Sequence, residues 1–148
     1  MKIVEKIEQD LFAAMKDKNS DMVRTLRMAM SSIKYAAKEK REELDDLAVI
    51  GVLQKEIRIH QETIEEAKKG NRQDIIQENM QDITILEKYL PAPLTEVELE
   101  TLVQKIIKET GAQSMKDMGK IMPVIVQEVN GRAPNNVISQ AVRKFLAG

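Results

Sequence analysis

The chain of 148 residues has no cysteine and no tryptophan, and only two tyrosines and two phenylalanines. Without cysteine, disulfides, thiolate metal sites and cysteine nucleophiles are excluded. The apolar runs are only a few residues long, far below the roughly 20 residues that span a bilayer, so no membrane partner is expected. The first six residues place an acid between two lysines and lack the apolar run of a signal peptide. We therefore expect a cytoplasmic protein.

The charge is nearly balanced, with 23 Lys and Arg against 24 Asp and Glu, a net charge of −1. This balance argues against a chain that binds polyanions over its whole surface. The distribution is uneven, because residues 114–148 contain five basic and two acidic residues, a difference of +3. A basic excess indicates nucleic-acid binding only where the charges share a face. The alternative is ordinary surface variation on a short helical pair.

The abundant residues are Ala, Leu, Ile, Met, Glu, Lys and Gln, all of which favour helix interiors. Apolar residues recur at helical spacing in four N-terminal segments, which cover about residues 2–17, 21–42, 46–69 and 72–90. The third segment has alternating spacings of three and four between Ile50 and Ala67, typical of a helix packed lengthwise on a neighbour. We predict an all-α protein whose residues 1–90 form an elongated helical domain.

Pro91-Ala92-Pro93 is the one clear boundary, because two prolines within three residues cannot continue a helix. After it we predict a compact three-helix bundle over residues 94–148. The first helix of this bundle begins with the capping box formed by Thr95 and Glu98 and ends at Gly111.

Ser114 is predicted to cap the second helix of the bundle and Gly131 to end it. Pro123 lies inside this helix and predicts a kink or a broken first turn near Met122. Pro134 suits the first turn of the third helix.

Several short motifs surround these helix ends. They are Thr25-Leu26-Arg27-Met28 with Ile33-Lys34, Tyr89-Leu90-Pro91, Leu94-Thr95, Gly111-Ala112 with Ser114, Asp117-Met118-Gly119-Lys120 and Gly131-Arg132-Ala133. Together they resemble the GatB/YqeY family over nearly the whole chain. That family includes the tail of the B subunit of tRNA-dependent amidotransferases, which grips tRNA and performs no chemistry, and stand-alone proteins of this length. The resemblance implies a C-terminal domain similar to that tail and a non-catalytic module that binds tRNA or another structured RNA.

The candidate RNA contacts are basic residues and their neighbouring glycines: Lys116, Gly119, Lys120, Gly131, Arg132, Arg143 and Lys144. A glycine lets another backbone approach closely, and Lys or Arg then reaches its phosphates. The free N–H groups of the helix after Pro134 suit a phosphate oxygen. The alternative is that Gly119 serves close helix packing, that Gly131 is only a cap, and that the charges solvate the surface.

The chain departs from the family pattern at Gln127-Glu128, where Pro and Lys are frequent, and at Pro134-Asn135, where an acid and a glycine are frequent. Glu128 therefore puts a negative charge beside the expected contact surface.

No catalytic residue, metal ligand set or cofactor is predicted, because the chain has no glycine-rich phosphate loop and no nucleophile motif. His60, the only histidine, lies on the apolar seam of the third segment, so we expect a packed residue with one hydrogen bond. The charge run of residues 38–43 is either a solvated helix end or, with Arg24, Arg27 and Lys34, an extension of an RNA surface.

Two other functions remain open. The link to amidotransferases implies the label of a carbon–nitrogen ligase with glutamine as amido-N-donor, although the large enzyme keeps its active sites in other domains. A helical protein–protein adaptor is the second, since nine methionines suit an adaptable surface. Its partner would be an amidotransferase or an aminoacyl-tRNA synthetase.

Overall fold

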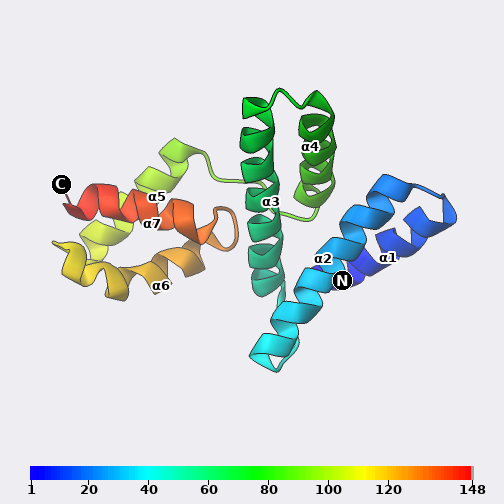
Figure 1. Ribbon diagram of the computed structural model, residues 1–148. Helices are drawn as coiled ribbons and strands as arrows, with labels where there is room; N and C mark the ends of the chain where they lie inside the picture. The colour runs from blue at the N-terminus through cyan, green and yellow to red at the C-terminus, as the bar shows by residue number, and fades with distance from the viewer. Residues whose placement is uncertain (148) are drawn as a thin grey trace. The chain divides into compact units, whose positions relative to one another are not determined.

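The computed structural model describes residues 1–147, and this part of the chain contains seven α-helices, one 3₁₀ turn and no strand. The all-α prediction is confirmed. The helices are α1 (Ile3–Lys16), α2 (Ser20–Lys40), α3 (Asp46–Lys69), α4 (Gln73–Glu87), α5 (Glu96–Thr110), α6 (Met118–Val129) and α7 (Asn135–Ala147), with the 3₁₀ turn η1 (Met115–Asp117) before α6. The chain divides into two compact units, the first from Met1 to Leu90 and the second beginning at Pro91 (Figure 1).

The first unit consists of two helical hairpins, α1–α2 and α3–α4, that share a core. Its longest helix, α3, has 24 residues and is therefore roughly 36 Å long, which gives this unit its elongated form. Leu26, Val49, Leu53 and Leu86 lie fully buried at the centre of the core. A smaller apolar cluster covers the end of the α3–α4 hairpin, where α3 ends and α4 begins.

A buried carboxylate joins three helices of this unit. Asp82 on α4 is 6% exposed and accepts hydrogen bonds from the Thr25 hydroxyl at 2.8 Å and from the Arg24 guanidinium at 3.1 Å. On α3, the Nδ1 atom of His60 lies 2.7 Å from the Asn79 amide oxygen and 3.8 Å from the Asp82 carboxylate. His60 is therefore a packed residue with a hydrogen bond, as predicted.

The predicted course of α4 needs two corrections. The helix ends at Glu87, short of the predicted residue 90. Helical spacing from Ile76 predicts that Met80 faces the core, but its side chain is 56% exposed. Asp82 and Ile85 are buried instead. The Asp82 carboxylate can occupy a buried position because Thr25 and Arg24 donate hydrogen bonds to it. The spacing of apolar residues along the sequence does not reveal these two donors.

The second unit is a bundle of α5, α6 and α7 around one apolar core in which Val103, Ile125 and Val142 are fully buried. The residues after Pro91 belong to this bundle through hydrogen bonds to the turn between α6 and α7. The backbone N–H of Leu94 donates to the Arg132 carbonyl at 2.9 Å, and the Arg132 Nε donates to the Ala92 carbonyl at 2.8 Å.

Local signals predicted the ends of α5 correctly. Thr95 and Glu98 form the reciprocal capping box, each backbone N–H donating to the other side chain at 3.1 Å. Gly111 ends the helix with a φ of +72°, a left-handed conformation in which glycine has no Cβ penalty.

The predictions for α6 were less accurate. The helix runs uninterrupted through Pro123, so the broken turn expected near Met122 is absent, and the irregular turn is η1 instead. At the other end, Asn130 is the left-handed cap with a φ of +50°, and Gly131 follows with a φ of +83°. Two successive left-handed residues reverse the chain into α7.

Candidate nucleic-acid interface

The structure distributes the seven predicted contact residues over three segments of the second unit. On η1 and the first turn of α6 lie Lys116, Gly119 and Lys120. The turn between α6 and α7 holds Gly131 and Arg132, and the end of α7 holds Arg143 and Lys144. Because α6 and α7 are antiparallel and η1 contacts α7, the start of α6 and the end of α7 meet at one end of the bundle (Figure 1).

We call this end of the bundle the cationic end, formed by Lys116, Gly119, Lys120 and Arg143. The three basic side chains are exposed, and none of them forms an ion pair with a residue that the structure describes. The one acid among them is Asp117, whose carboxylate accepts the backbone N–H groups of Gln113 at 2.8 Å and Ser114 at 3.4 Å. Those hydrogen bonds, and after them the charge of Lys120, lower the pKa of Asp117. The ionised Asp117 caps the turn and, as a single negative charge beside three cations, offsets them only in part.

Gly119 has a free surface above it. A Cβ added at this position would meet nothing within 4 Å, so the alternative that the glycine serves close helix packing is wrong. Four residues later stands Pro123, which has no N–H and cannot donate the regular helical hydrogen bond to the Gly119 carbonyl. The cationic end thus combines positive charges with a backbone oxygen that lacks its normal helical donor.

Arg132, at the opposite end of α6, has a structural role. Its Nε and its carbonyl hold the segment around Ala92 and Leu94 against the bundle. Glu98 lies close enough to Arg132 that, after the hydrogen bonds from Thr95, the arginine charge further lowers the pKa of Glu98. Arg132 is therefore a partly neutralised cation that anchors the start of this unit.

Lys144 also has a structural partner. Its Nζ lies 2.7 Å from a carboxylate oxygen of Glu100 on α5 and 5.6 Å from the centre of the Phe145 ring. The hydrogen bond to Glu100 raises the pKa of Lys144. Lys144 and Arg132 line a shared hollow of about 430 Å³ in this unit, but Glu96 and Glu100 line it too. Opposite charges inside the hollow make it a poor site for a polyanion.

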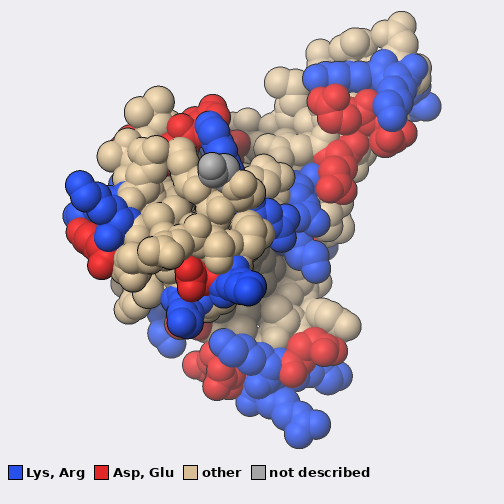
Figure 2. Space-filling view, turned by 90° about the vertical axis from the view of Figure 1, so that its left-hand side faces the viewer, with Lys and Arg blue, Asp and Glu red and all other residues tan. Residues whose placement is uncertain are grey.

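The seven predicted residues do not form one continuous basic surface. Figure 2 shows Lys and Arg side chains in separate groups, several of them beside Asp or Glu. The structure brings Lys116, Gly119, Lys120 and Arg143 to one end of the bundle and places Gly131 and Arg132 at the other. Sequence reasoning missed the effect of Pro123 on the Gly119 carbonyl, although the spacing of four between the two residues is the signal for it.

The described residues hold neither a metal-binding cluster nor a membrane-spanning helix. In residues 1–147 no three His, Asp or Glu side chains gather in a way that holds a metal ion. None of the described helices has the length and apolar character that a membrane span requires.

Comparison with known proteins connects this architecture to a family. The family model for Yqey-like proteins matches residues 4–146. The chain is 25% identical over 134 residues to altered inheritance of mitochondria protein 41, mitochondrial, of Pyrenophora tritici-repentis. That alignment covers 88% of this chain and 73% of the relative. Over 85 residues it is 33% identical to uncharacterized protein C22F3.15 of Schizosaccharomyces pombe, covering 57% of this chain and 69% of the relative. The matched region takes in both helical units, and the chain belongs to the YqeY-like family.

Proposed function

We propose that the protein is a non-catalytic RNA-binding module that contacts structured RNA, with tRNA as the first ligand to test, through its cationic end. One observation carries the proposal: Lys116, Lys120 and Arg143 are exposed without ion-pair partners in the described chain and lie at the same end of the bundle as the open backbone at Gly119. Unpaired cations bind phosphate without first breaking an internal ion pair. The relationship of this family to the amidotransferase B-subunit tail supports tRNA as the ligand.

The chemistry of the cationic end favours RNA over DNA. Phosphate oxygens accept from the Lys and Arg side chains, and the 2′-hydroxyl groups of RNA add contacts that DNA lacks. The second unit contains a single aromatic residue, the partly buried Phe145, so base stacking contributes little there. Recognition then depends on the shape of a folded RNA.

The test is tRNA binding by the full chain across a series of salt concentrations. The double variant Lys116→Gln/Lys120→Gln removes two predicted phosphate contacts, and we expect the salt slope to decrease by about 2. The matched control is Lys105→Gln/Lys108→Gln, which removes the same charge from exposed positions on α5 of the same unit. The control should bind tRNA as the unaltered protein does.

Three outcomes contradict the proposal. One is the absence of tRNA binding at micromolar protein in low salt, and another is equal weakening by the cationic-end variant and its control. The third is glutamine-dependent amidation of a mischarged tRNA by the pure protein, which would establish the carbon–nitrogen ligase alternative. A stable complex with a synthetase or amidotransferase that resists nuclease would instead favour the adaptor.

A cytoplasmic location is also part of this proposal. The Pyrenophora relative is named as mitochondrial, so the two compartments are the ones to compare. Fractionation of cells that express the tagged protein distinguishes them.

A further inference from the structure

The exposed face of α2 carries a row of unpaired positive charges. Arg27, Lys34 and Lys38 follow one another at spacings of seven and four residues, which place them along one line of an α-helix. The opposite face of the same helix, with Leu26 and Ile33, is buried in the core of the first unit. None of the three cations forms an ion pair with a described residue.

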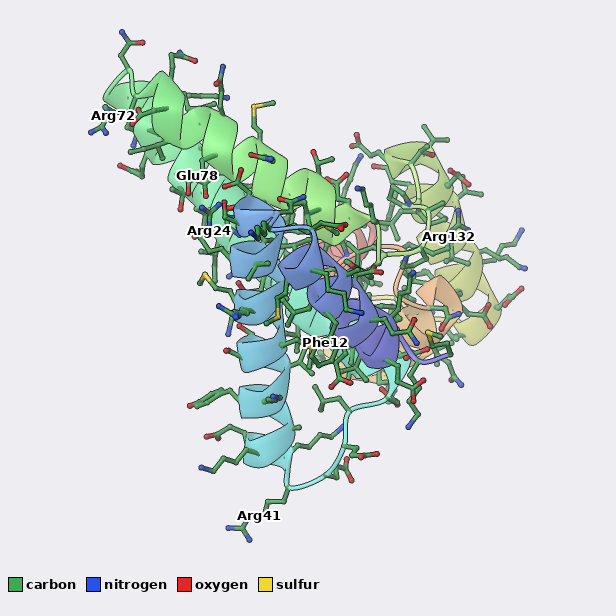
Figure 3. All side chains as sticks on the ribbon, turned by 90° about the vertical axis from the view of Figure 1, so that its right-hand side faces the viewer. Phe12, Arg24, Arg41, Arg72, Glu78 and Arg132 are labelled. Carbon is green, nitrogen blue, oxygen red and sulfur yellow. The ribbon has the colours of Figure 1, made fainter. Side chains whose placement is uncertain are left out.

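About half of the cations of this unit are compensated by an ion pair. Lys6 pairs with Asp10, and Lys68 pairs with Glu65. The sequence analysis named Arg24 together with Arg27 and Lys34 as part of a possible RNA surface. Arg24 forms ion pairs with Glu78 at 3.0 Å and with Asp82, at the point where α2 approaches α4 (Figure 3). The charge row is therefore a local excess in a unit that is acidic overall.

One exposed aromatic ring lies on α2 beside this row, and a second lies on the neighbouring helix α1. Tyr35 is 67% exposed and follows Lys34 directly, one turn before Lys38. Phe12 on α1 (Figure 3) is 64% exposed. It stands one turn before Met15, whose sulfur is 4.0 Å from the Arg27 guanidinium. These are two of the four aromatic residues in the chain, and burying a ring removes about 150–250 Å² from water. Most of the surface of these two side chains is left exposed by the packing of the first unit.

The positive surface continues from Arg27 to the turn between α1 and α2. A hollow of about 550 Å³ lies there, and Lys18 and Arg27 line it together with the ion-paired Arg24 and with Ser20, Val23 and Met28. No acid lines it. The surface thus runs along most of α2, a helix of 21 residues and roughly 30 Å.

We propose that this α1–α2 face binds single-stranded RNA, with phosphates along the Arg27–Lys34–Lys38 row and bases stacked on Tyr35 and Phe12. Interleaved cations and exposed flat rings are the combination by which proteins hold single strands, and a length of this kind suits several nucleotides. A lipid surface fits less well, because an interfacial helix inserts a continuous apolar face, and that face of α2 is buried. The site stands in the other unit and is independent of the cationic end.

The experiment measures binding of a fluorescent twelve-nucleotide oligouridylate, which has no folded structure, to the full chain. Arg27→Gln/Lys34→Gln should weaken binding roughly tenfold at low salt and reduce the salt slope by about 1.4. Tyr35→Leu should weaken it roughly tenfold through lost stacking, whereas Tyr35→Phe retains the ring and should stay within about twofold. Arg27, Lys34 and Tyr35 are all exposed, so these substitutions should leave the fold intact.

Two control variants distinguish this site from a general effect of lost charge and from the cationic end. Lys55→Gln/Lys69→Gln removes the same charge from exposed positions of α3 and should leave oligouridylate binding unchanged. Lys116→Gln/Lys120→Gln should also leave it unchanged, even if that variant loses tRNA. Equal loss in the α2 and α3 variants overturns the proposal, and so does equal affinity of Tyr35→Leu and Tyr35→Phe. Binding to phosphatidylserine vesicles without binding to the oligonucleotide also overturns it and identifies a membrane surface.

Discussion

Gly51 on α3 and Gly119 on α6 are both exposed helical glycines, but only Gly119 lies beside the basic side chains of the cationic end. At both positions an added Cβ would meet no atom within 4 Å, so alanine fits without strain. Alanine also reduces the freedom of the unfolded chain, which stabilises a helix by up to about 1 kcal/mol. Neither glycine is therefore explained by the packing of its own unit.

We predict that Gly119→Ala leaves the protein as stable as before or more stable, yet weakens tRNA binding roughly fivefold, equivalent to about 1 kcal/mol. The methyl group would occupy the open surface beside Lys116 and Lys120, where the proposed RNA backbone approaches. Gly51→Ala, on the other unit, should give a similar stability change with unaltered tRNA affinity. Urea unfolding and a binding titration on both variants check this. Identical tRNA affinities for the two variants would contradict a role for Gly119.

At the scale of the helices, a polar contact joins α1 to the segment after α4. The Tyr89 hydroxyl donates a hydrogen bond of 2.6 Å to the Asp10 carboxylate. Burial and that hydrogen bond raise the pKa of Tyr89 well above its ordinary value of 10. Burial by itself would raise the pKa of Asp10, but the hydrogen bonds from Tyr89 and Lys6 outweigh it and leave that pKa lowered.

This contact predicts a stability that depends on pH at both extremes. Above about pH 10 the unfolded chain loses the Tyr89 proton while the folded protein keeps it, so the free energy of unfolding decreases as the pH rises. Below about pH 4 the depressed pKa of Asp10 has the mirror effect, and stability decreases as the pH falls. Tyr89→Phe should cost about 1 kcal/mol at pH 7 and flatten both slopes.

Urea unfolding of Tyr89→Phe from acid to alkaline pH measures these slopes. Tyr35→Phe is the control, since the Tyr35 side chain is exposed and no hydrogen bond joins its hydroxyl to a described residue. If Tyr89→Phe and the unaltered protein show parallel profiles, the contact contributes nothing to the pH dependence.

At the scale of the whole molecule, two separate apolar cores predict two cooperative units. Leu53 is fully buried in the first core and Ile125 in the second. Truncation of either to alanine should cost about 2–5 kcal/mol. We expect Leu53→Ala to speed amide hydrogen exchange in the first unit only, from α1 to α4, and Ile125→Ala in α5, α6 and α7 only. Faster exchange throughout the chain in both variants would show that the protein unfolds as one unit.

Local physics made much of the fold predictable from the sequence. The Thr95–Glu98 box and the left-handed Gly111 act within one turn of the chain, and prolines near residue 91 forbid helix whatever lies around them. Apolar spacing predicted helix faces where the buried residues are apolar. It failed on α4, because Asp82 is buried with partners 57 and 58 residues away.

Taken by itself, the sequence determined an all-α chain, the two ends of α5 and the set of cations from which a binding site could be built. Only the tertiary structure decided which cations are free. Lys144 is paired across 44 residues of sequence and Arg132 is bonded across 40, whereas Lys116, Lys120 and Arg143 have no such partner among the described residues. The physical reason is that ion pairing depends on distances in space, which helix packing sets and sequence spacing does not.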